Sequence, residues 1–196
     1  MKKIIYTLLY SVLALSMTAC LGDDDNDDTF QLEVQTKILL GDMYGKYSGR
    51  LTTSNKDTIN NVEWKVDTTL HVNSLPDTLF AKCLAGHEEL AAALNGETTT
   101  DIHAPLVFAQ QASNDGSVRA FYLYPYILKK KMTYGGKEHT VEYVFANYPY
   151  SYGYFNKNGV TTFQIVLLTI LEDGKQITDV KQTSFIFTNS YAQITK

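Results

Sequence analysis

The chain has 196 residues, of which 44% are hydrophobic, and its formal net charge is −4. This length fits one domain, with two small domains as the alternative. If Lys2, Lys3 and the five aspartates within residues 23–28 are set aside, 21 acidic and 17 basic residues become 16 and 15. A nearly neutral folded part lacks the basic field that binds a phosphate backbone, so we expect no nucleic-acid partner.

The N-terminal segment predicts export. Lys2 and Lys3 precede an apolar run over residues 4–17, as in a secretory signal peptide. Residues 17–20, MTAC, resemble the lipobox at which bacterial lipoproteins are cleaved and lipidated; the alternative is an ordinary secretory signal with a chance cysteine. We expect residues 1–19 to be removed and Cys20 to carry acyl chains, such as palmitate, that hold the protein on a membrane.

An acidic run follows this cysteine. Residues 20–29 contain five aspartates in the stretch LGDDDNDDT, and like charges at this density keep a chain extended and solvated. We therefore expect a tether between the lipid and the folded part. The run also resembles the acidic export signal of Bacteroidetes-type surface lipoproteins. That resemblance implies an outer-membrane protein on the cell surface, with retention on the periplasmic face as the alternative.

Residues 30–196 are expected to form a single β-rich domain. Residues 30–40 fit both the strand and the helix period, and we expect a short helix that ends at Gly41. Residues 61–73, NVEWKVDTTLHVN, alternate between apolar and polar side chains. This alternation predicts one half-buried antiparallel strand with Trp64 in the core.

Residues 76–94 change character and predict the helical part of the fold. Pro76 suits the first position of a helix, Asn95 and Gly96 suit its end, and Gly86 suits a break. We therefore expect one or two short helices here. Cys83 within this segment is expected to be a small buried side chain, and with Cys20 lipidated no intramolecular disulfide can form.

Apolar strand patterns return from residue 104 onward. Gly135-Gly136 and Asp173-Gly174 have the composition of hairpin turns. Residues 163–171 are apolar at both parities, which predicts a central strand covered on both faces. With about eight strands in all, we expect a mainly β fold. It would be an antiparallel two-sheet sandwich or a flattened barrel, with one short helical insert (about 76–94) and an N-terminal helix.

Catalytic and metal-binding patterns are not evident in the sequence. The segment GHEELA contains His87, but a zinc-protease helix needs a second histidine four positions later, where an alanine stands. Asp67 and His71 share one strand face, for which a solvated face is the simpler interpretation. Asp101 and His103 flank an apolar residue in an apparent loop that offers no third ligand. We expect no enzyme activity, no catalytic residue, no metal site and no cofactor.

The segment ANYPYSYGYFN, residues 146–156, carries the remaining signal for function. Tyr148, Tyr150, Tyr152 and Tyr154 alternate along it, and Pro149 and Gly153 disfavour a regular central strand. We expect a loop whose four tyrosines share one face. Such rings suit the binding of a glycan or a partner protein, and the alternative is that they cover the protein's own sheet.

Three Asp-Thr pairs resemble the O-glycosylation sequon of the same bacterial group. They place candidate acceptors at Thr58, Thr68 and Thr78. Thr58 lies among polar residues typical of a loop and is therefore expected to be the best acceptor.

The layout as a whole resembles a family of small surface lipoproteins of about this length, the domain of unknown function 4840. The likeness rests on the MTAC motif, the acidic tether, GDMYGKYSGRL (41–51), VEWKVDTTLHV (62–72) and SLPDTL (74–79). It implies the location and a β-rich fold, and no catalytic residues. The expected function is a non-catalytic binding module for a glycan or protein partner. The alternative is a structural or assembly accessory of a larger cell-envelope complex, with no ligand of its own.

Overall fold

The computed structural model describes residues 40–96 and 98–189. These residues form a mainly β fold with two short α-helices and one 3-10 turn, so the predicted fold class is confirmed. The elements in chain order are η1 (Leu40–Met43), β1 (Gly45–Thr53), β2 (Thr58–Val66), β3 (Thr69–Pro76), α3 (Thr78–Ala81), α4 (Glu88–Leu94), β4 (Thr99–Gln111), β5 (Val118–Leu123), β6 (Leu128–Tyr134), β7 (Lys137–Phe145), β8 (Tyr152–Asn156), β9 (Thr161–Glu172), β10 (Lys175–Gln176) and β11 (Thr183–Thr188).

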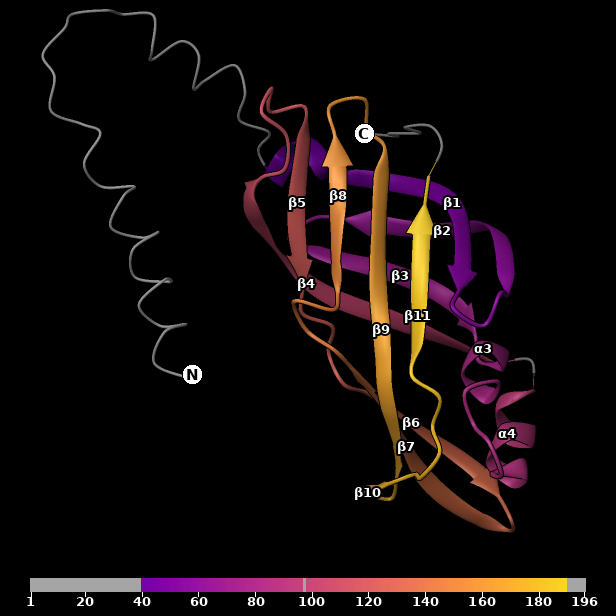
Figure 1. Cartoon of the computed structure of the whole chain (residues 1–196). Coiled ribbons are helices and arrows are strands. Elements are labelled where there is room, and N and C mark those ends of the chain that lie inside the picture. Colours follow the sequence, from indigo (N-terminus) through magenta and orange to yellow (C-terminus); the bar gives the residue numbers. More distant parts are fainter. Residues whose placement is uncertain (1–39, 97, 190–196) are drawn as a thin grey trace, which may run out of the picture. The chain divides into compact units, whose positions relative to one another are not determined.

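Eight of the strands close into an antiparallel barrel. The hydrogen-bonded order is β11-β1-β2-β3-β4-β5-β8-β9, and β9 pairs with β11 to complete the circle. In Figure 1 the strands β5, β8, β9 and β11 lie side by side in front, and β1 to β4 run across behind them. The barrel is therefore flattened into two crossing walls, and continuous pairing around it distinguishes it from a sandwich of two separate sheets.

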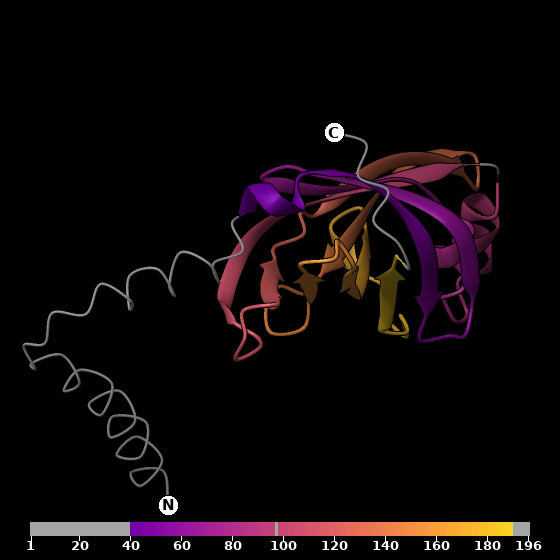
Figure 2. The same cartoon turned by 90° about the horizontal axis from the view of Figure 1, so that it is seen from above.

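Strand β9 is longer than the barrel and changes partners along its length. Residues up to Leu167 pair with β8 and β11, and from Leu167 to Glu172 the strand pairs with β7 and β10 instead. The hairpin β6–β7 therefore extends the sheet beyond the barrel, with α4 beside it (Figure 2). The two glycines at its tip, Gly135 and Gly136, both have positive φ, as the predicted two-residue turn requires.

Aromatic side chains fill the barrel. Trp64 is almost fully buried, its ring is stacked on Tyr47, and it meets Phe163 and Phe187 edge-on. The predicted burial of Trp64 is thus confirmed, and with it the parity assigned to residues 62–72. Cys83 is buried as well, as expected.

The prediction of one strand over residues 61–73 is wrong, because a tight turn divides it into β2 and β3. Val66 pairs with Leu70, and the Asp67 carboxylate accepts a hydrogen bond from the backbone N–H of Thr69 at 2.8 Å. Each residue of β2 faces a residue of the same parity in β3, so the apolar alternation runs through the turn without a break. Periodicity alone cannot detect such a hairpin.

The helical insert is confirmed, with its break at Gly86, but Pro76 does not begin a helix. Pro76 ends β3, where it pairs with Thr99. The following residue, Asp77, is fully buried, and its carboxylate accepts hydrogen bonds from Thr98 (2.5 Å) and Thr100 (2.6 Å) and pairs with Lys130. This buried anchor fixes where the chain leaves the sheet and begins α3.

Two further strand predictions need correction. Residues 163–171 are central, as expected, but not covered on both faces, because Leu168 is exposed on the outside. Asp101 and His103 lie on β4 and not in a loop.

The predicted helix over residues 30–40 falls almost wholly outside the described residues. Within the described part of the chain, no helix is long and apolar enough to cross a membrane.

Candidate functional site

The front wall of the barrel has an aromatic exterior. Residues at odd positions of β5, β8, β11 and the part of β9 up to Leu167 point into the barrel, and those at even positions point out, although Val166 is itself buried. The pairing register places Tyr122, Tyr152, Gln164 and Ile186 in one outward row across these four strands. Because neighbouring strands lie about 4.8 Å apart, the side chains in such a row are in reach of each other.

The turn before β8 places Tyr148 and Tyr150 next to this row, and Tyr154 follows Tyr152 on the outer face of β8. The rings of Tyr148 and Tyr122 lie 3.8 Å apart between centroids, and those of Tyr152 and Tyr154 lie 5.8 Å apart. A hydrogen bond with the Tyr148 hydroxyl raises the pKa of Tyr122 above its ordinary value. We call the set Tyr122, Tyr148, Tyr150, Tyr152 and Tyr154 the tyrosine face.

Buried Ser151 holds this turn in place. Its hydroxyl donates to the carbonyl of Ala146 at 2.5 Å and accepts from the backbone N–H of Val166 at 3.2 Å. Its own carbonyl accepts from the N–H of Leu123. The Gln164 side chain also donates to the carbonyl of Tyr150. Because these hydrogen bonds join the turn to β5 and β9, the barrel positions the tyrosines of the turn. The conformational entropy of the turn is therefore lost when the protein folds and not when a ligand binds.

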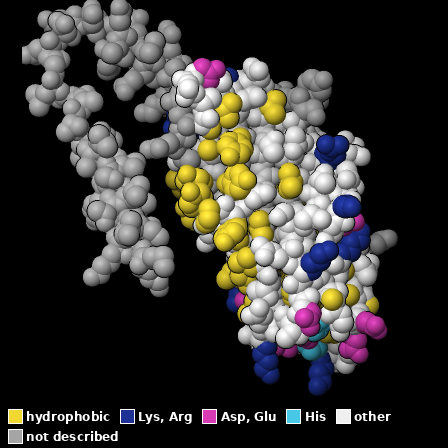
Figure 3. Space-filling model, in the orientation of Figure 1, with side chains coloured by type: hydrophobic (Ala, Val, Ile, Leu, Met, Phe, Trp, Pro, Cys, Tyr) yellow, Lys and Arg dark blue, Asp and Glu magenta, His cyan; other side chains and the backbone are white. Residues whose placement is uncertain are grey.

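The rings are open to solvent. Tyr148 is 49% exposed, Tyr150 58% and Tyr154 46%, whereas Tyr152 is half-buried. In Figure 3 hydrophobic side chains form a band over β5, β8 and the segments below them, and charged side chains lie mainly to its side and beneath it. Further large apolar residues that are exposed in the described part of the chain are Tyr44, Val107, Tyr124, Tyr126, Ile127, Leu168 and Ile186.

Charge is absent from the outward positions of the described front wall. On β5 they are Val118, Ala120 and Tyr122, and on β8 they are Tyr152, Tyr154 and Asn156; β9 up to Leu168 and β11 present Thr162, Gln164, Val166, Leu168, Ser184, Ile186 and Thr188. Such a surface offers flat π-faces and phenol hydroxyls.

The expectation that residues 147–155 form a loop is wrong for its second half. Tyr152–Asn156 is a strand that pairs with β5 on one side and β9 on the other. Tyr152 and Tyr154 share its outer face, as strand alternation predicts, and Tyr148 and Tyr150 approach from the turn. Tyr122 was not among the predicted site residues, although the alternation in FYLYPY (121–126) carries the signal that identifies it.

The histidines and acids considered at the sequence level do not come together as one site. His71 contacts His103 through Nδ1 (2.9 Å) and Asp67 through Nε2 (3.3 Å), so its two partners lie at opposite edges of the ring. Asp101 accepts a hydrogen bond from the backbone N–H of Ser74. A cluster that the sequence analysis did not identify forms around His139, at the far end of β9.

The candidate glycosylation sites differ in their setting. Thr58 is the first residue of β2, paired with Thr52, and not part of a loop, although it is exposed. Thr68 is exposed at the tip of the β2–β3 turn, and Thr78 is half-buried at the start of α3. Cys20 and the acidic run lie outside the described residues.

Fold and surface together define a small β-barrel with a tyrosine-rich, uncharged outer wall. The chain belongs to the family described as Domain of unknown function (DUF4840), which it matches over residues 42–172. This confirms the resemblance to the domain of unknown function 4840. No curated protein and no solved structure matches the chain. The family match spans β1 to the end of β9, and thus all five residues of the tyrosine face.

Proposed function

We propose that this protein is a non-catalytic binding module whose tyrosine face takes up a glycan or a protein partner. The observation that carries the proposal is the exposure of Tyr148, Tyr150 and Tyr154 on a backbone held by buried Ser151. A protein that needs tyrosines only for packing would turn them inward. These rings instead face solvent on a wall without charge, and exposed apolar patches of a few hundred Å² usually mark interaction sites.

The proposed location is the outer membrane, with Cys20 as the lipid anchor and the cell surface as the side exposed. The sequence supports this through residues 17–20 and the five aspartates that follow. An extended tether of eight residues reaches about 25–30 Å, enough to carry a small barrel clear of lipid headgroups. At a cell surface, a wall that binds glycans or proteins would meet ligands from outside the cell.

O-glycosylation is proposed at the same time, with Thr68 as the best placed acceptor. Thr68 is at the tip of a turn, whereas Thr58 is engaged in the β1–β2 ladder and Thr78 is half-buried. A modifying enzyme reaches a turn more easily than a paired strand.

The function is tested with glycan and protein arrays probed with the full chain in detergent. The matched variants are Tyr150→Ala/Tyr154→Ala on the tyrosine face and Tyr44→Ala, which removes an exposed ring next to η1 that is not part of the tyrosine face. Wild type and Tyr44→Ala should bind the same ligand, and the double variant should lose it while its unfolding temperature stays unchanged. Absence of any ligand, or a large loss of stability in the double variant, would overturn the proposal in favour of an accessory role.

A further inference from the structure

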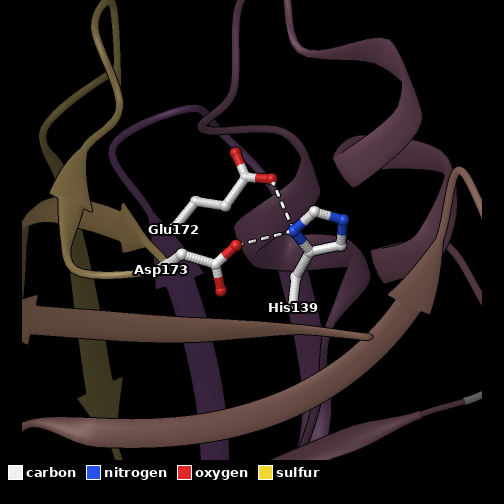
Figure 4. Close-up of side chains that lie close together, drawn as sticks. All are labelled: His139, Glu172 and Asp173. Atoms are coloured by element: carbon white, nitrogen blue, oxygen red, sulfur yellow. Dashed lines mark hydrogen bonds and ion pairs between the residues drawn. The ribbon is translucent and has the colours of Figure 1, made fainter. Parts of the chain in front are cut away.

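Three side chains of metal-binding type converge at the end of β9, away from the tyrosine face. The Nδ1 atom of His139 lies 2.9 Å from Asp173 Oδ2 and 3.2 Å from Glu172 Oε1. One ligand atom from each of the three residues lies within 4.8 Å of the other two. Figure 4 shows both carboxylates directed at the same ring nitrogen. His139 and Asp173 are 34 positions apart in the sequence, so no short motif could indicate the cluster.

Asp173 is held in position by the backbone. It occupies the turn between β9 and β10 with φ of 51°, followed by Gly174 with φ of 77°. Its N–H donates to the carbonyl of Thr140 at 2.9 Å, and its Oδ1 accepts from the Thr140 N–H at 2.8 Å. This pair of hydrogen bonds leaves Oδ2 directed at His139. One oxygen of the carboxylate is thus used for structure and the other is presented as a ligand.

Tyr134 orients the remaining two groups. Its ring is stacked on the His139 imidazole, with 4.2 Å between centroids and 17° between planes, and its hydroxyl donates to Glu172 Oε1 at 2.5 Å. An aromatic neighbour that fixes the ring and a hydrogen bond that fixes the carboxylate are the outer contacts that support protein metal sites. The cluster is therefore positioned in advance.

We propose that His139, Glu172 and Asp173 bind a divalent transition-metal ion, with Zn²⁺ as the best-fitting ion. Bonds of about 2.0–2.1 Å to a tetrahedral zinc place ligand atoms about 3.3 Å apart, close to the two separations around Nδ1. Two carboxylates also balance the charge of the ion. The imidazole nitrogen favours zinc over Mg²⁺ and Ca²⁺, which prefer oxygen ligands.

The site keeps a coordination position open to solvent. The side chains of His139, Glu172 and Asp173 are 18%, 32% and 53% exposed, so the ion can enter from the Asp173 side. Three protein ligands leave the fourth position of a tetrahedral zinc to water or to a group from a bound partner. This inference is independent of the tyrosine face and of the function proposed for it.

Isothermal titration of the full chain in detergent with ZnCl₂ tests the site. We expect one zinc ion per chain bound in a His139-dependent manner, and no comparable heat with MgCl₂. His139→Ala should weaken binding by more than about 100-fold, because the loss of an outer contact alone costs about 10- to 100-fold. Tyr134→Phe should fall within that smaller range. The matched control is Glu138→Gln, which removes an exposed carboxylate of the same hairpin that pairs with Lys131.

The same experiment distinguishes the cluster from two other places where zinc could bind. The aspartates of residues 23–28 are present in every variant, so the difference between wild type and His139→Ala isolates the cluster. His103→Ala tests the pair formed by His71 and His103. The proposal is overturned if wild type binds no zinc, if His139→Ala binds it as tightly, or if His103→Ala abolishes binding. A zinc-induced shift of the His139 Nδ1 resonance, with ¹⁵N-labelled histidine, supports it independently; a shift at Nε2 instead would contradict it.

Discussion

The Cα of Gly153 lies directly against the ring of Phe121. A Cβ added at Gly153 would lie 2.3 Å from Phe121 Cζ and 2.6 Å from the Cβ of Phe163. Register explains the contact, because Phe121, Gly153, Phe163 and Phe187 form one inward row across the front wall. Two large rings fill the space on either side of a residue without a side chain. In the sequence, Gly153 disfavours a central strand. In the fold, its missing side chain leaves room for Phe121 and Phe163, and β8 can therefore lie between β5 and β9.

Gly153→Ala should destabilise the protein by at least about 1–3 kcal/mol, because the added methyl group forces the rings of Phe121 and Phe163 out of their positions. The free energy of unfolding in urea measures the effect. Gly41→Ala is the control, since a Cβ there has no atom within 4 Å and the residue does not have a left-handed φ. Equal stability of the two variants would show that the barrel adapts around residue 153.

Trp64→Ala should lower the free energy of unfolding by about 3–5 kcal/mol, because the indole is nearly fully buried among aromatic rings. Trp64→Phe, which keeps a ring in the cavity, should lose less. Trp64 is the single tryptophan of the chain, so native fluorescence reports on it alone. An emission maximum typical of an indole in water would refute the burial.

Asp67 should make stability depend on pH at the acid end. The hydrogen bond from the Thr69 N–H, followed by contacts with Lys65 and His71, lowers the pKa of Asp67 to about 2. A depressed pKa means that the ionised carboxylate stabilises the fold above about pH 4, and that this contribution disappears as the pH falls toward 2.

Asp67→Asn tests this contribution through thermal unfolding at several pH values. Above pH 4 the variant should be less stable by about 1 kcal/mol or less, because solvent screens a partly exposed carboxylate. The difference from wild type should shrink between pH 4 and pH 2. A difference that stays constant over this interval would mean that the charge of Asp67 contributes nothing.

The proposed lipid anchor and the proposed tether can be tested separately in cells. Cys20→Ala should abolish lipid labelling and leave the chain uncleaved or released. Deletion of residues 23–28 should leave lipidation intact and protect the protein from protease added to whole cells. Replacement of the same aspartates by glutamates is the control, because it preserves length and charge. Membrane-bound protein of normal processed mass after Cys20→Ala would exclude the lipid anchor.

Much of the fold could be predicted from alternation. The apolar even positions of residues 62–72 are buried as the pattern predicts, with Thr68 exposed at the turn between them. The pairs Gly135-Gly136 and Asp173-Gly174 lie in turns, as expected. The β2–β3 hairpin escaped detection because its partners share parity, so the turn leaves the pattern unchanged. The place where α3 begins escaped for another reason. It depends on the buried carboxylate of Asp77, whose partners Thr98 and Lys130 are distant in the sequence.

The candidate site was predictable only in part. The four alternating tyrosines could be read from the chain, but whether their rings face inward or outward depends on Gly153 and on the hydrogen bonds of Ser151. The cluster around His139 has no local pattern at all, because a β-hairpin and the end of a distant strand bring it together. The orientation of the tyrosines and the assembly of the His139 cluster both depend on the pairing register of distant strands, which sequence spacing does not reveal.

The extension of β9 beyond the barrel also has a consequence for solubility. A closed barrel has no free edge, but β6 ends the sheet and pairs with β7 alone among the described strands. Its unpaired backbone groups form a template on which another chain could add a strand. Lys129 and Lys131 on β6 are mostly exposed, and they pair with Glu142 and Glu138 of β7. A strand added at this edge would have to desolvate these exposed charged side chains, so Lys129 and Lys131 oppose edge-to-edge aggregation.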